Sequence, residues 1–227
     1  MSSPIRVLVW NEGIEEKQKP EVLEHYPNGI HQAIADAIKL VPSIQVRTAT
    51  MDQPETGLSN AVLSETDVLV WWSHNAYDQV PGEATERVKL RVLDGMGFVG
   101  LHSAMLSNVF KELLGRPCTA PWRNVGEREL IWTVDPSHPI AQGIEPPIEL
   151  PCEEMYGEPF DVPPPDELIF LSWFEGGEVF RSGMCYRKEK GRIFYFRPGH
   201  ETYPTFLHPK VQRVLQNAVL WAAHSPD

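Results

Sequence analysis

The stretch FVGLHSAM, residues 98–105, decides the fold class of this sequence. Its first half is apolar and predicts the end of a buried strand, and its second half turns through small residues into a helix. Enzymes with open α/β folds often present a nucleophile at the tip of such a turn. The residue at the tip here is His102, so the stretch predicts an α/β fold with an imidazole at its centre.

Three further runs before this stretch have the pattern of strands with helical segments between them. Residues 5–10 and 67–74 are nearly continuous apolar runs, as expected of strands that are covered on both faces. Residues 44–50 are half polar, which favours a position nearer the edge of the sheet. Between the runs at 5–10 and 44–50, Asn28 is expected to cap an amphipathic helix. Strands that alternate with helices indicate a parallel sheet with right-handed crossovers.

The second half of the sequence has a different character. Strand-like runs at 129–134, 167–174, 179–187 and 192–198 have no helical segments between them, so we expect antiparallel strands added at one side of the parallel sheet. Residues 151–160 lie among many prolines and are expected to be irregular. A final helix is predicted from one apolar stripe made of Val211, Val214, Leu215, Ala218, Val219 and Ala222.

Composition bounds the classes of function. The 227 residues contain no long linker or charge block, so we expect a single domain over residues 1–227. The formal net charge is −11 and no basic cluster is present, so neither nucleic acid nor an anionic membrane is an expected partner. Three widely spaced cysteines fit neither a disulfide framework nor a zinc knuckle. Because residues 1–10 also lack a secretory signal, a cytoplasmic protein with reduced thiols is expected.

Polar residues follow four strands of the predicted sheet at the points where those strands end. In an open α/β sheet, ligands bind beyond the carboxyl ends of the strands. These strand ends should therefore deliver their side chains to one edge, with Asn11 and Ser103 as substrate contacts. The predicted site contains Asn11, Glu12, His74, His102, Ser103, His200 and Glu201.

Three imidazoles from separate strand ends would form an open site for a divalent metal, with zinc as the first choice. His74, His102 and His200 would be the ligands, and one position would remain for water or substrate. Glu12 or Glu201 would orient the ligands or act as a general base. The spacing matches no local metal signature, so this hypothesis depends on the predicted fold. The alternative for each histidine is a structural hydrogen bond to a loop carbonyl.

An aromatic residue beside carboxylates marks a second group of candidates. Glu154 and Tyr156 are expected to contact a sugar, because such sites stack a ring on the pyranose and accept hydroxyl hydrogen bonds. The alternative is that this acidic run is a solvated face. Trp122 is a further candidate for stacking, whereas Trp10 and Trp71 are expected in the core. No cysteine occupies the turn, so a nucleophilic thiol is not expected.

Four motifs, in this order, resemble those of the ThuA-like family, which is associated with trehalose utilisation. They are GLHSA at 100–104, HPI followed by GI within 138–144, EMYGEPF at 154–160, and GRIFYFRPGHETYPTF at 191–206. The resemblance covers essentially the whole sequence. It implies a fold like that of class I glutamine amidotransferases: a flavodoxin-like three-layer sandwich whose mostly parallel sheet carries additional antiparallel strands in its C-terminal half.

The same resemblance places several residues relative to the amidotransferase triad. In those enzymes a cysteine stands on the turn after a central strand, and a histidine and a glutamate near the C-terminus complete the triad. His102 would stand at the cysteine's place, and His200 and Glu201 fall in the stretch that supplies the other two. Without the cysteine, glutamine hydrolysis through a thioester is excluded at this site. The resemblance implies a small-molecule carbohydrate as the partner.

Three hypotheses about function follow. The first is a metal-assisted enzyme that hydrolyses a disaccharide, or abstracts a proton beside a carbonyl of a keto-sugar, with Glu12, Glu154 or Glu201 transferring the proton. In the second, His102 and His200 act as acid and base without a metal. The third is a non-catalytic sugar-binding or regulatory subunit. The apolar content of the late strands is compatible with a homo-oligomer.

Overall fold

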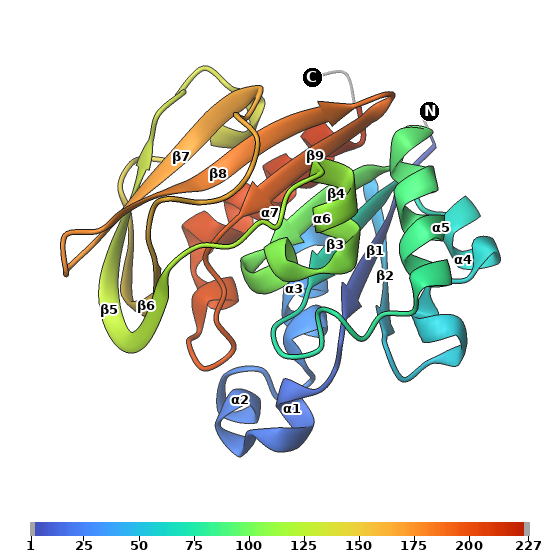
Figure 1. Ribbon diagram of the computed structural model, residues 1–227, viewed down its shortest axis with the longest axis horizontal. Helices are drawn as coiled ribbons and strands as arrows, with labels where there is room; N and C mark the ends of the chain where they lie inside the picture. Colours follow the sequence, from blue (N-terminus) through green and yellow to red (C-terminus); the bar gives the residue numbers. More distant parts are fainter. Residues whose placement is uncertain (1–2, 225–227) are drawn as a thin grey trace.

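A mixed sheet forms the centre of the computed structural model, which describes residues 3–224 (Figure 1). Within these residues the sheet has nine strands in the order β2-β1-β3-β4-β9-β8-β7-β5-β6. The first five in this order are parallel to one another, and the remaining strands are antiparallel to their neighbours. The strands are β1 (Ile5–Asn11), β2 (Ile44–Thr50), β3 (Val68–Trp72), β4 (Gly97–Leu101), β5 (Trp122–Thr133), β6 (Ile148–Tyr156), β7 (Glu167–Phe174), β8 (Val179–Lys188) and β9 (Gly191–Phe196).

This arrangement confirms the α/β class and the change from parallel to antiparallel pairing in the second half. Every residue of β3 and β4 is buried, as their continuous apolar sequences predict for strands covered on both faces. β2 has exposed residues at Gln45 and Arg47 and lies at one edge of the sheet, as its half-polar sequence predicts.

Helices cover both faces of the sheet. Residues of α3 and α7 belong to one apolar cluster, and residues of α4, α5 and α6 belong to another (Figure 1). All six residues of the apolar stripe expected in the final helix are buried in α7. Within the described part of the chain, no helix combines the length and the apolar character that crossing a membrane requires. The helices are α1 (Glu15–Gln18), α2 (Pro20–His25), α3 (Ile30–Ile38), α4 (Asn60–Ser64), α5 (Gly82–Leu93), α6 (Asn108–Leu114) and α7 (Pro209–Ala222), with 3₁₀ turns η1 (Pro54–Gly57), η2 (His102–Leu106), η3 (Pro139–Ala141) and η4 (Thr205–Leu207).

The expected cap of α3 is wrong. The residue at the N-cap is Gly29, with φ of 89°, and no side chain of the N-cap accepts a hydrogen bond. Instead, Glu16 Oε1 accepts from the main-chain nitrogen of Ile30 at 2.9 Å. A carboxylate supplied by α1 thus replaces the amide cap that was predicted for Asn28, and its negative charge suits a helix N-terminus.

The prediction of irregular structure across residues 151–160 is also wrong for its first six residues, which belong to β6. β6 is the outermost strand beside β5. An edge strand tolerates proline because one row of its main-chain groups makes no ladder bonds, so Pro151 does not interrupt it. As a result, Glu153, Glu154 and Tyr156 are placed by a strand, and all three side chains are buried.

Candidate active site

The turn after β4 holds His102 in an uncommon backbone conformation. Its φ is +53°, in the left-handed region that side chains other than glycine rarely adopt. The ring is fully buried and donates from Nδ1 to the main-chain carbonyl of Arg197 at 3.2 Å. The Tyr156 ring stacks on it, with centroids 5.4 Å apart. The predicted sharp turn is therefore present, and the imidazole is fixed by contacts from the segment after β9 and from the end of β6.

The sheet gathers the three predicted histidines because β3, β4 and β9 are neighbours whose carboxyl ends meet. The ring centroid of His74 lies 5.2 Å from that of His102 and 5.0 Å from that of His200. The centroids of His102 and His200 are 5.5 Å apart. Side chains that lie 28 and 98 residues apart in the sequence thus form one compact cluster.

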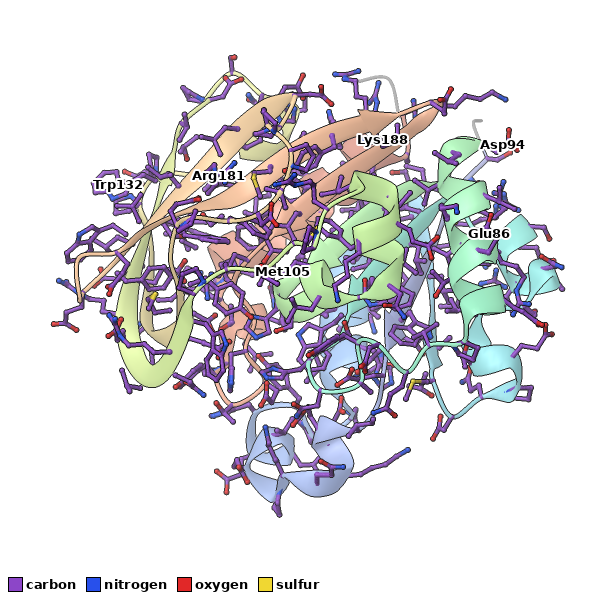
Figure 2. All side chains as sticks on the ribbon, in the orientation of Figure 1. Glu86, Asp94, Met105, Trp132, Arg181 and Lys188 are labelled. Atoms are coloured by element: carbon purple, nitrogen blue, oxygen red, sulfur yellow. The ribbon has the colours of Figure 1, made fainter. Side chains whose placement is uncertain are left out.

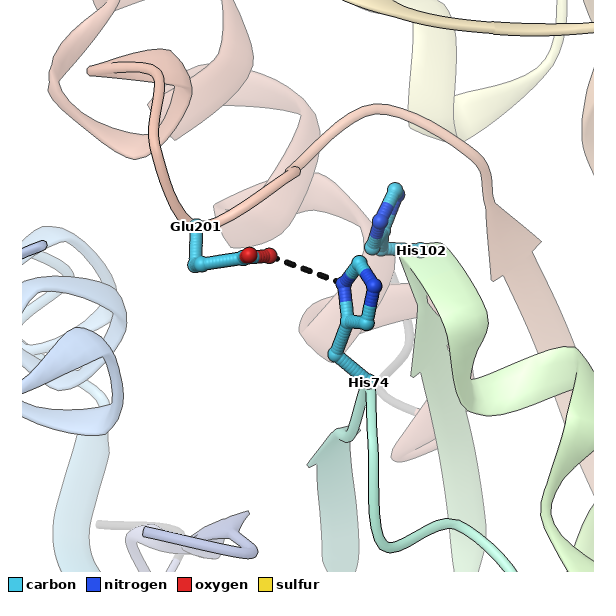
Figure 3. Close-up of side chains that lie close together, drawn as sticks. All are labelled: His74, His102 and Glu201. Atoms are coloured by element: carbon cyan, nitrogen blue, oxygen red, sulfur yellow. Dashed lines mark ion pairs between the residues drawn. The ribbon is translucent and has the colours of Figure 1, made fainter. Parts of the chain in front are cut away.

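Two of these histidines and one carboxylate present donor atoms to a common space. His74, His102 and Glu201 each offer an atom, and these atoms all lie within 4.8 Å of one another (Figure 3). His74 Nδ1 is 2.8 Å from Glu201 Oε2, and His102 Nε2 is 3.2 Å from Glu154 Oε2. These four atoms are buried and none makes a hydrogen bond of good geometry in the described structure. Such an arrangement of nitrogen and carboxylate atoms suits a bound cation.

His200 lies in the cluster but its nitrogens are already engaged. Tyr203 donates its hydroxyl hydrogen to Asn124 Oδ1 at 2.7 Å, so the Asn124 amide nitrogen faces His200 Nε2, 2.9 Å away. His200 Nδ1 lies 2.9 Å from the Thr202 hydroxyl. Burial, and then the nearby His102, lower the pKa of His200 to about 3. The imidazole is therefore neutral, and both of its nitrogens are engaged: Nε2 by the Asn124 amide, and Nδ1 by the hydroxyl and the main-chain N–H of Thr202, the latter at 3.3 Å.

The carboxylates of the cluster are ionised. Burial alone would raise the pKa of Glu201, but the facing His74 and the Lys19 ammonium, 2.6 Å away, hold it far below its usual value. Burial likewise opposes ionisation of Glu154, and His102 outweighs it and lowers the pKa of that carboxyl. In return, Glu201 raises the pKa of His74 against the effect of burial. Lys19 contacts Glu201 Oε1, so the negative charge that faces the imidazoles is that of Glu201 Oε2 and Glu154 Oε2, and either a protonated imidazole or a bound cation would balance it.

Two residues predicted for the site, Asn11 and Glu12, bind main-chain groups of the surrounding loops. Both carboxylate oxygens of Glu12 accept main-chain N–H bonds, from Asn75 and Ala76, each at 2.8 Å. Glu12 thereby anchors the loop that carries His74, and burial raises the pKa of its carboxyl. Asn11 donates to Glu16 at 2.6 Å and accepts from the main-chain nitrogen of Gly13. Neither residue lines the cavity of about 390 Å³ that lies beside the cluster.

Sequence reasoning missed the residues that hold the His200 loop. Glu153 accepts from the main-chain nitrogens of Gly199 and His200, at 2.8 and 3.1 Å, and from the Thr205 hydroxyl at 2.9 Å. Arg197, fully buried, pairs with Glu129. The arginine stands inside the motif RPGHE, next to a predicted ligand, and that position was the available signal.

A cavity of about 390 Å³ opens beside the cluster. His74, Ser103 and Glu154 contribute to its lining, and the Ser103 hydroxyl lies 2.7 Å from that of Tyr156. Because Ser103 and Glu154 are almost completely buried, this part is the inner end of the cavity. Its mouth is formed by exposed residues, among them Trp122, 66% of whose surface is accessible. A substrate in the cavity would thus contact the cluster directly.

Comparisons with known proteins give one family. The sequence model of ThuA, described as trehalose utilisation, matches residues 6–222. No curated protein matches the sequence.

Three solved structures illustrate the similarity of fold. A ThuA-like protein from Parabacteroides merdae superposes with a TM-score of 0.70 at 15% identity, covering 97% of this chain and 90% of that one. A cytoplasmic protein from Salmonella typhimurium gives 0.64 at 12% identity, covering 96% and 99%. A protein described as a GMP synthase subunit from Thermoplasma acidophilum gives 0.55 at 12% identity, covering 99% and 96%. At these identities the structures share the fold alone.

Proposed function

This chain belongs to the ThuA family of trehalose utilisation, and from that premise we propose that it is a metal-assisted enzyme acting on a disaccharide or its keto derivative. One observation carries the proposal. His74, His102 and Glu201 each offer a donor atom within 4.8 Å of the others, and His74 Nδ1, His102 Nε2 and Glu201 Oε2 are buried without hydrogen bonds of good geometry. Two imidazoles and a carboxylate are a ligand set found in catalytic zinc sites, where the fourth position stays open.

The proposed ligand set differs from three imidazoles. His200 Nε2 is engaged by the Asn124 amide and Nδ1 by Thr202, whereas Glu201 Oε2 lies free of a hydrogen bond of good geometry beside His74. We therefore assign Glu201 as the third ligand and leave His200 outside, as a neutral group at the wall of the site. A divalent ion bound there would polarise a substrate oxygen or activate a water molecule.

Glu154 is the residue of this chain that is best placed to move a proton. It lines the cavity, and its Oε2 atom is 3.2 Å from His102 Nε2. An ionised carboxylate at this position can accept a proton from water or from a carbon beside a carbonyl. Ser103 and Tyr156, also in the lining, would orient hydroxyl groups of the sugar.

Metal analysis tests the ligand set. Protein purified with added zinc should carry one ion per chain, and His74→Ala, His102→Ala and Glu201→Gln should each lose it. His25→Ala, on the separate helix α2, is the control and should retain the ion. Absence of bound metal from the wild-type protein after supplementation would overturn the assignment. Turnover of disaccharides and their keto derivatives by the loaded protein then tests the reaction.

Two alternatives are distinguished by the same experiments. The His74–Glu201 and His102–Glu154 contacts would serve as plain ion pairs in a metal-free acid–base site, which predicts turnover without metal. A non-catalytic sugar-binding or regulatory subunit predicts binding of a disaccharide without turnover of any substrate in the panel.

The proposal also covers the cellular compartment of the protein and the layer arrangement of its fold. We place the protein in the cytoplasm, supported by its three free cysteines and by the Salmonella neighbour that is described as cytoplasmic. Helices on both faces of the sheet support a flavodoxin-like, three-layer arrangement. A homo-oligomer stays a prediction.

A further inference from the structure

The mouth of the cavity differs chemically from its inner end. The inner end holds His74, Ser103 and Glu154, whereas Tyr77 and Trp122 stand among the lining residues beyond the cluster. We propose that this mouth is a second subsite, in which the Trp122 indole packs against the apolar face of an uncharged sugar ring. The inference rests on the proposed function, because the first ring is taken to sit at the histidine cluster.

The pairing of β5 with β6 directs the indole towards the cavity. Trp122, the first residue of β5, lies directly opposite Tyr156, the last residue of β6. Directly opposed residues of an antiparallel pair project to the same face of the sheet. Tyr156 lines the cavity and stacks on His102. Trp122 therefore extends the aromatic wall outward from the cluster.

The exposure of Trp122 provides the surface that a ligand could cover. The side chain is 66% exposed, although an indole is among the largest apolar groups in proteins. Met105 and Leu106, which follow His102 in η2, also line the cavity. A sugar ring has C–H groups on one face and hydroxyls at its edge, so its apolar face suits the indole.

The charges in the lining of the cavity disfavour a phosphorylated ring. Among the described residues that line it, none is lysine or arginine, and Glu154 is the carboxylate. Arg123, which follows Trp122 in β5, is paired with Glu127 and Glu178. Lys19 is paired with Glu15 and with Glu201 of the cluster. A phosphate group at the mouth would therefore lack a free cationic partner in the lining and would meet an acidic protein.

The volume of the cavity is consistent with two rings. About 390 Å³ falls within the range of roughly 300–1,000 Å³ that is usual for small-molecule sites. One ring at the cluster and a second at Trp122 would be joined across the lining that Tyr156 provides. The subsite would thus select disaccharides over single sugars.

Calorimetric binding tests this subsite apart from catalysis. The metal-loaded full-length protein is titrated with trehalose, maltose, glucose and trehalose 6-phosphate. We expect Trp122→Ala to weaken disaccharide binding about tenfold, the effect of losing one aromatic contact, and to change glucose binding by less than about twofold. Trp122→Phe should recover most of the loss. The wild-type protein should bind trehalose at least about tenfold more tightly than its 6-phosphate.

Trp132→Ala is the matched control. Trp132 is the other exposed tryptophan of β5 and lies at the outer side of the molecule, away from Met105 of the cavity (Figure 2). Its replacement should leave all affinities unchanged. Thermal melting of both alanine variants shows whether either has lost its fold, and Trp122→Phe provides the second test if Trp122→Ala is unstable.

The outcomes separate the subsite from the proposed function. Disaccharide turnover with a KM that Trp122→Ala leaves unchanged would overturn the subsite and keep the enzyme. Binding that depends on Trp122, without turnover of any sugar, would keep the subsite and overturn the catalytic proposal. Equal affinity for trehalose and its 6-phosphate would overturn the proposal that the subsite takes an uncharged sugar ring. Failure of every sugar in the panel to bind would overturn the subsite, and failure of the keto derivatives to react as well would overturn the proposed function.

Discussion

The ring of His102 donates from Nδ1 to the main-chain carbonyl of Arg197, 3.2 Å away, and this bond sets the tautomer of the central imidazole. A carbonyl oxygen can only accept, so the proton of the neutral ring stands on Nδ1 and the lone pair on Nε2. Nε2 then faces Glu154 and the common space of the cluster. The main chain just after β9 thus fixes the tautomer of the residue just after β4 so that its Nε2 can bind a cation.

The backbone at His102 predicts a difference between two variants that both lack the imidazole. With φ at +53°, glycine fits this position and alanine does not. His102→Gly should be about 0.5–1 kcal/mol more stable than His102→Ala, since relief of left-handed strain exceeds the entropy that glycine loses. Urea unfolding of the two proteins measures it. An alanine variant at least as stable as the glycine variant would contradict the strain.

Glu153 should contribute to stability through the His200 loop. It accepts from Gly199, His200 and Thr205 while fully buried. Glu153→Gln presents an NH₂ group to at least one donor, so we expect a loss of about 1–3 kcal/mol in the free energy of unfolding. Denaturant unfolding is the measurement. Glu149→Gln, at an exposed position of the same strand, is the control and should change little.

Gly97 at the start of β4 should tolerate no side chain. A Cβ atom there would lie 2.6 Å from the main-chain oxygen of Ala222 at the end of α7, and a main-chain atom cannot rotate away. Gly97→Ala should lower the free energy of unfolding by about 1–3 kcal/mol through overpacking. Gly82→Ala is the control, because nothing lies within 4 Å of a Cβ at that helix N-terminus. Similar melting temperatures for both variants would refute the prediction.

The pair between Arg6 and Asp67 should make stability depend on pH. Arg6, through its side-chain hydrogen bonds, lowers the pKa of Asp67 below its ordinary value of 3.8, against the effect of burial. The unfolded carboxyl therefore binds protons more readily, so the stabilisation is present above its ordinary pKa and is lost as the pH falls through the lower folded value. The difference in unfolding free energy between wild type and Asp67→Asn should be largest near about pH 6 and shrink towards about pH 3. A difference that is constant over this range would contradict it.

Most of the sheet could be predicted from local pattern. The runs at 44–50 and 167–174 match β2 and β7 residue for residue, because buried or half-buried strands impose their own periodicity. β6 was missed, since Pro151 and three glutamates interrupt its apolar sequence. What makes it a strand is a neighbour: it pairs with β5 at the edge of the sheet, and that partner is not visible in the local sequence.

The residues of the candidate site could also be predicted in part from local pattern, whereas the roles of their atoms could not. Strand ends indicated His74, His102 and His200, because parallel strands bring their carboxyl ends together whatever the details of packing. The role of each nitrogen could not be predicted. His200 is engaged by Asn124, which lies 76 residues earlier in the sequence and belongs to β5 on the antiparallel side of the sheet.

By itself, the sequence determined the family, the α/β class and the set of imidazoles at one edge of the sheet, since hydrophobic periodicity and strand ends are local properties of the chain. Only the tertiary structure decided which atoms remain free to bind a ligand. Glu12 is engaged by main-chain N–H groups and His200 by an amide, whereas His74, His102 and Glu201 face one another. Hydrogen bonds between distant segments determine which of these atoms are engaged, because a buried polar group bonds to the partner that the fold places next to it.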